Sequence, residues 1–282
     1  MENNTLFVAR KAVLFFLSSA FVFLFSFGIF SYAFIEKFFD VQTYENSLER
    51  RGIYGEVAEK LKSSILLSLP YEVQEQASEE IGRAIDEEYA RVQVISGIKS
   101  ASDYLLLKSQ ELNLHISLEK VKSELGKSES PYLKAAAILL PSKIDLAGSL
   151  SNEQKSQLQS ARLQISAIKS FGQIAIPIAI LLLIPFFLLQ PDCKTGLHEI
   201  GKLLSKSGFF SLTIAASLIL LFPAILPNAL SSLHGPLSQD AYKIGQIISD
   251  GLSESGRFLL ILSLPILLAG FLISFSSKSR NP

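Results

Sequence analysis

The chain has 282 residues, of which 49% are hydrophobic and only 18% are charged, and its formal net charge is zero. Soluble domains carry about a quarter charged residues, so this composition is typical of a membrane bundle with one modest extramembrane domain. The balanced charge gives no field that would attract nucleic acid. A single cysteine, Cys193, excludes an intrachain disulfide and a multi-cysteine zinc site.

An uninterrupted apolar stretch runs from Ala12 to Ile35, between Lys11 and Glu36. A helix needs about 20 apolar residues to cross a bilayer, whereas the apolar region of a signal peptide has about 7–15. Although Ser31-Tyr32-Ala33 has the small residues of a cleavage site, the length favours a helix that stays in the membrane. We therefore expect a first transmembrane helix here.

The segment 36–169 follows, and it has mainly helical periodicity. Within residues 56–69, which are followed by Pro70, apolar residues recur at every fourth position. A second helix is expected from about residue 73 to 91, with one apolar stripe and two ion pairs on the opposite face. The first stripe consists of Val57, Leu61 and Ile65; the second of Val73, Ala77, Ile81, Ile85 and Tyr89, with the pairs Glu79–Arg83 and Glu87–Arg91.

The rest of this segment contains shorter elements. Residues 112–117 alternate apolar and polar, as in a strand, but with no convincing partner strand we interpret them as an extended connector. Ser117 is expected to cap a short helix ending near Gly126, and Ser130-Pro131 to open another that ends before Pro141. Ser151 and Gln154 form a capping box for a long helix that continues into the next apolar stretch.

Three further apolar stretches, 170–191, 207–230 and 258–277, are each close to the length of a membrane span. The predicted fold class is an all-α integral membrane protein with four transmembrane helices and a helical extracytoplasmic domain inserted between the first and second spans. The expected segments are 1–11 (cytoplasmic), 12–35 (first span), 36–169 (extracytoplasmic domain), 170–191 (second span), 192–206 (cytoplasmic loop), 207–230 (third span), 231–257 (outer loop), 258–277 (fourth span) and 278–282 (cytoplasmic tail).

The orientation follows from the distribution of Lys and Arg in the short flanking segments, which are richer in these residues on the cytoplasmic side. The other short loop, 231–257, offers Lys243 among three acidic residues. We therefore expect both termini in the cytoplasm of a plasma-membrane protein. The residues that indicate this side are Arg10, Lys11, Lys194, Lys202, Lys206, Lys278 and Arg280.

Two groups of residues are candidates for contacts. In the loop 192–206, Leu197, Ile200 and Leu204 share one side, which predicts a short amphipathic helix on the inner membrane surface. The alternative is that these leucines and isoleucine contact a separate cytoplasmic ATPase. On the third span, Ser207, Ser211 and Ala215 recur every fourth residue, which predicts a helix-packing face.

Chemical motifs are missing from the sequence. It contains neither G-x-x-x-x-G-K-[ST] nor G-x-G-x-x-G nor a nucleophile motif, so we expect no cofactor, no metal and no enzymatic activity. The histidines, His115, His198 and His234, have no ligand spacing. The spans contain no charge, which argues against a self-sufficient ion-coupled transporter. Three of the spans contain prolines. These either break the helices around a transport pathway or are the prolines that membrane helices commonly tolerate. They are Pro177, Pro185, Pro223, Pro227 and Pro265.

The layout resembles permease subunits of the FtsX and MacB type in topology alone. They share cytoplasmic termini, a large outer domain between the first two spans, a long second helix and a short cytoplasmic loop before the third. Two hypotheses stand ahead of hydrolase or transferase activity. The first is a non-enzymatic envelope or cell-surface protein whose outer domain binds or senses a protein partner. The alternative, which the resemblance implies, is a mechanical permease-like subunit driven by a separate ATPase.

Overall fold

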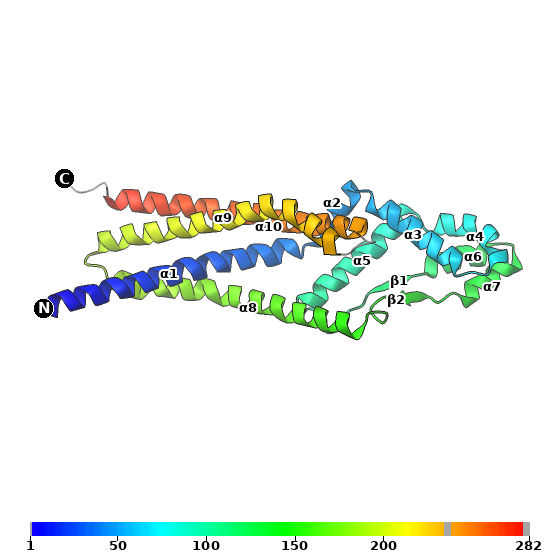
Figure 1. Cartoon of the computed structure of the whole chain (residues 1–282), viewed down its shortest axis with the longest axis horizontal. Coiled ribbons are helices and arrows are strands. Elements are labelled where there is room, and N and C mark those ends of the chain that lie inside the picture. Colours follow the sequence, from blue (N-terminus) through cyan, green and yellow to red (C-terminus); the bar gives the residue numbers. More distant parts are fainter. Residues whose placement is uncertain (1, 234–237, 279–282) are drawn as a thin grey trace. The chain divides into compact units, whose positions relative to one another are not determined.

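The computed structural model describes residues 2–233 and 238–278 and is 84% helical. The described residues form ten helices and one two-stranded sheet (Figure 1). They divide into two compact units: the residues up to Thr43 together with those from Ala167 form the bundle unit, and Tyr44–Ser166 form the inserted unit. The expected all-helical class is confirmed, with the small sheet as an addition.

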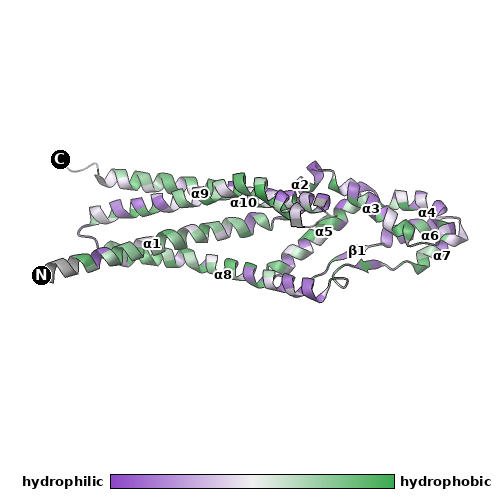
Figure 2. Ribbon diagram, viewed as in Figure 1, coloured by the Kyte–Doolittle hydropathy of each residue, from purple (hydrophilic) through white to green (hydrophobic). Residues whose placement is uncertain are grey.

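Among the described residues, four helices are long and apolar enough to cross a membrane, which confirms the expected number. Figure 2 shows how hydrophobic residues predominate along them, in contrast to the mixed colouring of α2 to α7. The four are α1 (Glu2–Phe38), α8 (Asn152–Leu188), α9 (Cys193–Leu233) and α10 (Ser238–Lys278).

The helices α9 and α10 pack along each other in antiparallel directions (Figure 1). A Cβ added at Gly201 would lie 2.6 Å from the backbone nitrogen of Ser274, and one at Gly270 would lie 2.5 Å from that of Ser205. Real Cβ atoms do not approach backbone this closely, so only glycine allows this separation of the two helices. The helix α1 packs against both.

Two expected loops are helical instead. Residues 193–206 continue into the third apolar stretch as one helix, α9, and residues 238–257 belong to α10. The expectation of a separate amphipathic helix before residue 207 is therefore wrong. The reason is packing, because the buried Leu203 and Ser207 continue one packed face across the Ser207-Gly208 pair, which could otherwise favour a turn. The prolines of α8, α9 and α10 also lie within continuous helices.

The inserted unit has its own apolar core. The expected stripes contribute to it, because Ile65, Val73, Ala77 and Ile81 are all buried in one cluster with residues of the later short helices. Its helices are α2 (Val41–Arg50), α3 (Ile53–Leu67), α4 (Tyr71–Ala84), α5 (Glu87–Leu105), α6 (Glu119–Lys127) and α7 (Pro131–Leu139).

Three expectations within this unit need correction. The helix expected to extend from residue 73 to 91 is broken at Ile85-Asp86, because Asp86 caps a new helix, and Arg91 therefore pairs with Glu45 and Glu88 rather than Glu87. Residues 112–117 are more than a connector: β1 (His115–Ser117) pairs antiparallel with β2 (Lys143–Asp145). Ser117 thus belongs to a strand, and Leu118 precedes α6 without a side-chain cap.

Other local signals are confirmed. Pro131 is the first residue of α7, and Arg83 lies 2.9 Å from Glu79 in the expected ion pair. The backbone nitrogen of Ser151 donates to the Gln154 side chain at 2.9 Å, and that of Gln154 donates to the Ser151 hydroxyl at 3.2 Å. This reciprocal pair is the expected capping box, and α8 runs on from it without interruption to Leu188.

Candidate functional site

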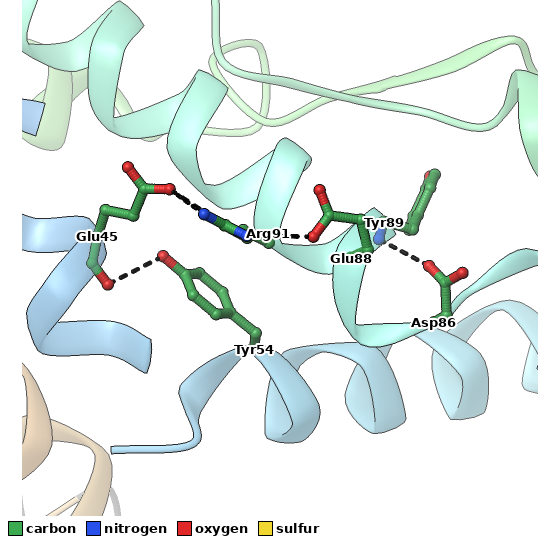
Figure 3. Close-up of polar contacts among 6 residues, drawn as sticks. All are labelled: Glu45, Tyr54, Asp86, Glu88, Tyr89 and Arg91. Carbon is green, nitrogen blue, oxygen red and sulfur yellow. Dashed lines mark hydrogen bonds and ion pairs between the residues drawn. The ribbon is translucent and has the colours of Figure 1, made fainter. Parts of the chain in front are cut away.

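A polar cluster of the inserted unit is centred on Arg91 of α5 (Figure 3). Its Nη2 and Nε lie 2.6 Å and 3.1 Å from Glu45 Oε1, and its Nη1 lies 3.4 Å from Glu88 Oε2. The hydrogen bond with Glu45 is the main reason that the pKa of Arg91 is raised, with the charges of Glu45 and Glu88 adding to it. Because Glu45 belongs to α2, this pair joins two helices distant in sequence.

Tyr54 adds a second link to the same point of α2. Its ring is buried, and its hydroxyl donates to the main-chain oxygen of Glu45 at 3.4 Å (Figure 3). Burial, and then the charge of Glu45, raises the pKa of the Tyr54 phenol. Glu45 is therefore bound through both its side chain and its backbone.

Asp86 fixes the start of α5. Its Oδ1 accepts a hydrogen bond from the backbone nitrogen of Tyr89 at 2.7 Å, and its Oδ2 lies 3.1 Å from Lys120 Nζ. The Tyr89 bond first, and the Lys120 bond second, lower the pKa of Asp86. The Tyr89 hydroxyl in turn donates to the main-chain oxygen of Ser117. The cap thus holds α5 against both β1 and α6.

These side chains serve to hold helices together. Arg91 is paired with Glu45 and Glu88, and Asp86 with Lys120 and the backbone of Tyr89. Within the two described ranges, no group of three or more His, Cys, Asp and Glu is arranged to hold a metal ion. His115 lies on β1, His198 lies on α9 beside Ser274 of α10, and His234 falls outside the described residues.

The inserted unit also carries solvent-exposed apolar side chains that the sequence analysis did not single out. Five of them are between 70% and 85% exposed: Leu67, Tyr71, Tyr132, Ile138 and Leu139. They lie at the end of α3, the start of α4 and along α7, the elements whose other faces build the core. In the sequence these are large apolar residues next to the positions that are buried. Periodicity alone would assign such residues to the core, so it does not reveal that they are exposed.

The predicted contact residues of the segment 192–206 are not equivalent. Leu197 is 49% exposed, whereas Ile200 and Leu204 are partly buried and pack against the cluster that contains Phe21 and Leu203. Leu197 is therefore the most exposed of the three. The remaining two contribute to the packing of α9 within the bundle unit.

The predicted packing face of the third apolar stretch is buried throughout. Ser207, Ser211 and Ala215 are each fully buried, and the Ser26 hydroxyl of α1 donates to the main-chain oxygen of Ser207 at 3.2 Å. An added Cβ at Gly256 of α10 would lie 3.0 Å from the main-chain oxygen of Ala215. The sequence analysis missed these partner residues because Gly256 lies in a segment expected to be a loop.

Comparison with known protein families, curated proteins and solved structures finds no match for this chain.

Proposed function

We propose that the chain is a multipass plasma-membrane protein, non-enzymatic, whose segment 36–169 lies outside the cell membrane and binds or senses a protein partner of the envelope or cell surface. Four helices able to cross a bilayer support the membrane part. A separate core for the inserted unit supports the second part, because a unit with its own core can present a binding surface of constant shape.

The orientation in this proposal comes from charge. Lys11, Lys194 and Lys202 belong to the segments assigned to the cytoplasm, and short loops rich in Lys and Arg remain on that side of a membrane. Both termini are then cytoplasmic, and the inserted unit faces outward.

The observation that carries the partner-binding proposal is the group of exposed apolar side chains Leu67, Tyr71, Tyr132, Ile138 and Leu139. Exposed apolar surface on an otherwise packed unit is typical of protein interaction sites. Leu67 of α3 and Ile138 and Leu139 of α7 are largely exposed to solvent. By contrast, Leu133 and Ala136 of α7 are buried.

Purification in mild detergent after cross-linking on intact cells tests this proposal. We expect one protein to be recovered with the chain and to be lost when Ile138→Ser and Leu139→Ser are combined. Val92→Ser is the matched control, because Val92 is also exposed and apolar but lies on α5. Recovery that is unchanged by the paired substitutions, or that is equally reduced by the control, contradicts the assignment to this surface.

A second candidate is the permease-like subunit with a separate cytoplasmic ATPase. Leu197 favours it, because this leucine is exposed near the start of α9 while its neighbours Ile200 and Leu204 are packed. An exposed apolar side chain next to Lys194 suits contact with another protein.

Leu197→Ser tests this alternative better than replacing all three residues, since changes at Ile200 and Leu204 would also disturb the bundle. The permease-like function predicts that Leu197→Ser abolishes pull-down of an ATPase without changing membrane insertion. Leu188→Ser provides the control, because Leu188 is exposed at the end of α8. Absence of an ATPase among the recovered proteins removes this candidate.

A further inference from the structure

The helices α1, α8 and α9 enclose a hollow of about 310 Å³ within the bundle unit. Its charged lining comes from Lys11 of α1 and from Glu199, Lys202 and Lys206 of α9, and its uncharged polar lining from Ser18, Gln190 and Thr195. Lys202 Nζ lies 2.6 Å from Glu199 Oε1, so one lysine neutralises the carboxylate. The hollow is thus lined by three lysines and one glutamate.

The same hollow has an apolar side. Leu14, Phe186 and Leu203 line it, and Phe186 and Leu203 are almost fully buried in the cluster that also contains Phe21. Lysines beside an apolar lining favour a ligand that is both anionic and hydrophobic, because a small inorganic anion would gain no binding free energy from the apolar side chains.

A second hollow of about 460 Å³ lies beside it, between α1, α9 and α10. Phe209, Phe210 and Phe271 line this hollow, and Lys206 belongs to the lining of both. Apart from Lys206 and Ser205 its lining is apolar. Lys206 therefore stands at the border between a charged hollow and one suited to a hydrocarbon chain.

We infer that these two hollows form a binding site for an anionic phospholipid. The phosphate is held by Lys11, Lys202 and Lys206, and an acyl chain lies against the phenylalanines of the second hollow. Basic pockets between membrane helices bind lipid phosphates, because opposite charges attract strongly at the edge of the low-dielectric bilayer. The inference requires the bundle unit to lie in a bilayer and is independent of what the inserted unit binds.

Native mass spectrometry of the full chain tests this site. The protein is released from nanodiscs that contain equal amounts of phosphatidylglycerol and phosphatidylcholine. We expect at least one phosphatidylglycerol to stay bound in preference to phosphatidylcholine. Lys11→Gln combined with Lys206→Gln should reduce this retention about thirtyfold, since each basic residue near the membrane surface strengthens lipid binding about fivefold. Equal retention of the two lipids overturns the inference.

Arg10→Gln combined with Lys194→Gln is the matched control. It removes the same charge from the same segments, but neither residue lines the hollow. Retention should stay within about twofold of the unmodified chain. An equal loss of phosphatidylglycerol retention in the control would show that general surface charge, and not the hollow, holds the lipid. That result would overturn the site. Lys206→Met removes the charge but keeps the aliphatic part of the side chain, so lipid retention can be measured in it if the double variant fails to fold. Unchanged retention of phosphatidylglycerol in this variant counts against the site.

Soluble phosphate separates the two possible sources of the anion. Addition of inorganic phosphate or glycerol phosphate in large excess should leave the lipid bound, because neither compound fills the apolar hollow. Displacement of phosphatidylglycerol by either one would make the site a soluble-phosphate site and overturn the lipid assignment.

Discussion

Arg91 and Ile81 illustrate how differently two side chains of the inserted unit contribute to its stability. Arg91 bonds to Glu45 and Glu88, but the pair is partly exposed to water, which screens such interactions. Ile81 is fully buried among apolar neighbours, and its removal would leave a cavity. The ion pair therefore orients α2 against α5, whereas the apolar core supplies most of the stabilising free energy.

This difference predicts the outcome of two substitutions. Arg91→Ala should lower the free energy of unfolding by no more than about 1 kcal/mol, the usual range for exposed ion pairs. Ile81→Ala should lower it by about 2–4 kcal/mol, as for other large-to-small core changes. Chemical unfolding of the inserted unit, followed by circular dichroism, measures both. The reverse order would show that the polar cluster, rather than the core, stabilises the unit.

Asp86 predicts a pH dependence. Its pKa in the folded chain is lowered by the Tyr89 backbone bond and by Lys120, so the charged form stabilises the fold. This contribution is present above the ordinary range of an aspartate and is lost as the pH falls through the lowered value.

Asp86→Asn keeps an acceptor for the cap but removes the charge, so it isolates the pH-dependent part. The stability difference from the unmodified chain should be largest near neutral pH and should shrink to nothing in acid. Asp86→Ala serves for comparison, because it also loses the cap, at a cost of about 1 kcal/mol at all pH values. Unfolding midpoints measured across the acid range decide this, and a difference independent of pH would contradict it.

At the scale of elements, short-range signals in the sequence were sufficient to predict where a helix begins if one or two neighbouring residues determine that start. Pro131 begins α7, and Ser151 with Gln154 caps α8, because each needs only its own neighbours. The break at Asp86 could not be found from the apolar stripe, since Ile85 and Tyr89 remain buried on both sides of it. The pairing of β1 with β2 joins segments about 30 residues apart, which local alternation cannot reveal.

The candidate contact residues show the same limit. Small residues at positions 207, 211 and 215 predicted a packing face, but not that α1 and α10 cover it. An amphipathic pattern identified Leu197, Ile200 and Leu204 together, whereas only the tertiary structure separates the exposed Leu197 from its packed neighbours.

Gly270 provides a test of the pairing between α9 and α10. A side chain there meets the backbone of Ser205, which cannot rotate away, so Gly270→Ala should force the two helices apart. We expect a loss of about 1–3 kcal/mol, seen as a lower unfolding temperature in detergent. Leu272→Ala is the control, because Leu272 is 71% exposed on the same helix and should have a smaller effect. Equal tolerance of both substitutions would argue against this close approach.

At the scale of the whole molecule, the chain consists of a unit rich in apolar helices and a unit with a conventional buried core. The main apolar cluster of the inserted unit is built from residues between Val57 and Ile144. This independence predicts that the unit folds without the membrane helices.

A fragment from Val41 to Lys169 should therefore give a helical circular-dichroism spectrum and a cooperative thermal transition. Burial of the cluster around Ile81, Val121 and Leu133 supplies the driving force. A random-coil or strand-dominated spectrum would contradict an inserted helical domain.

Cys193 allows the most direct test of the central proposal, that the inserted unit faces outward and the α8–α9 connection faces the cytoplasm. It is the only cysteine of the sequence, and its side chain is exposed at the start of α9. A membrane-impermeant maleimide therefore has a single target that it can reach. The account predicts no labelling of intact cells and full labelling after permeabilisation. Labelling of intact cells would invert the topology and place residues 36–169 in the cytoplasm.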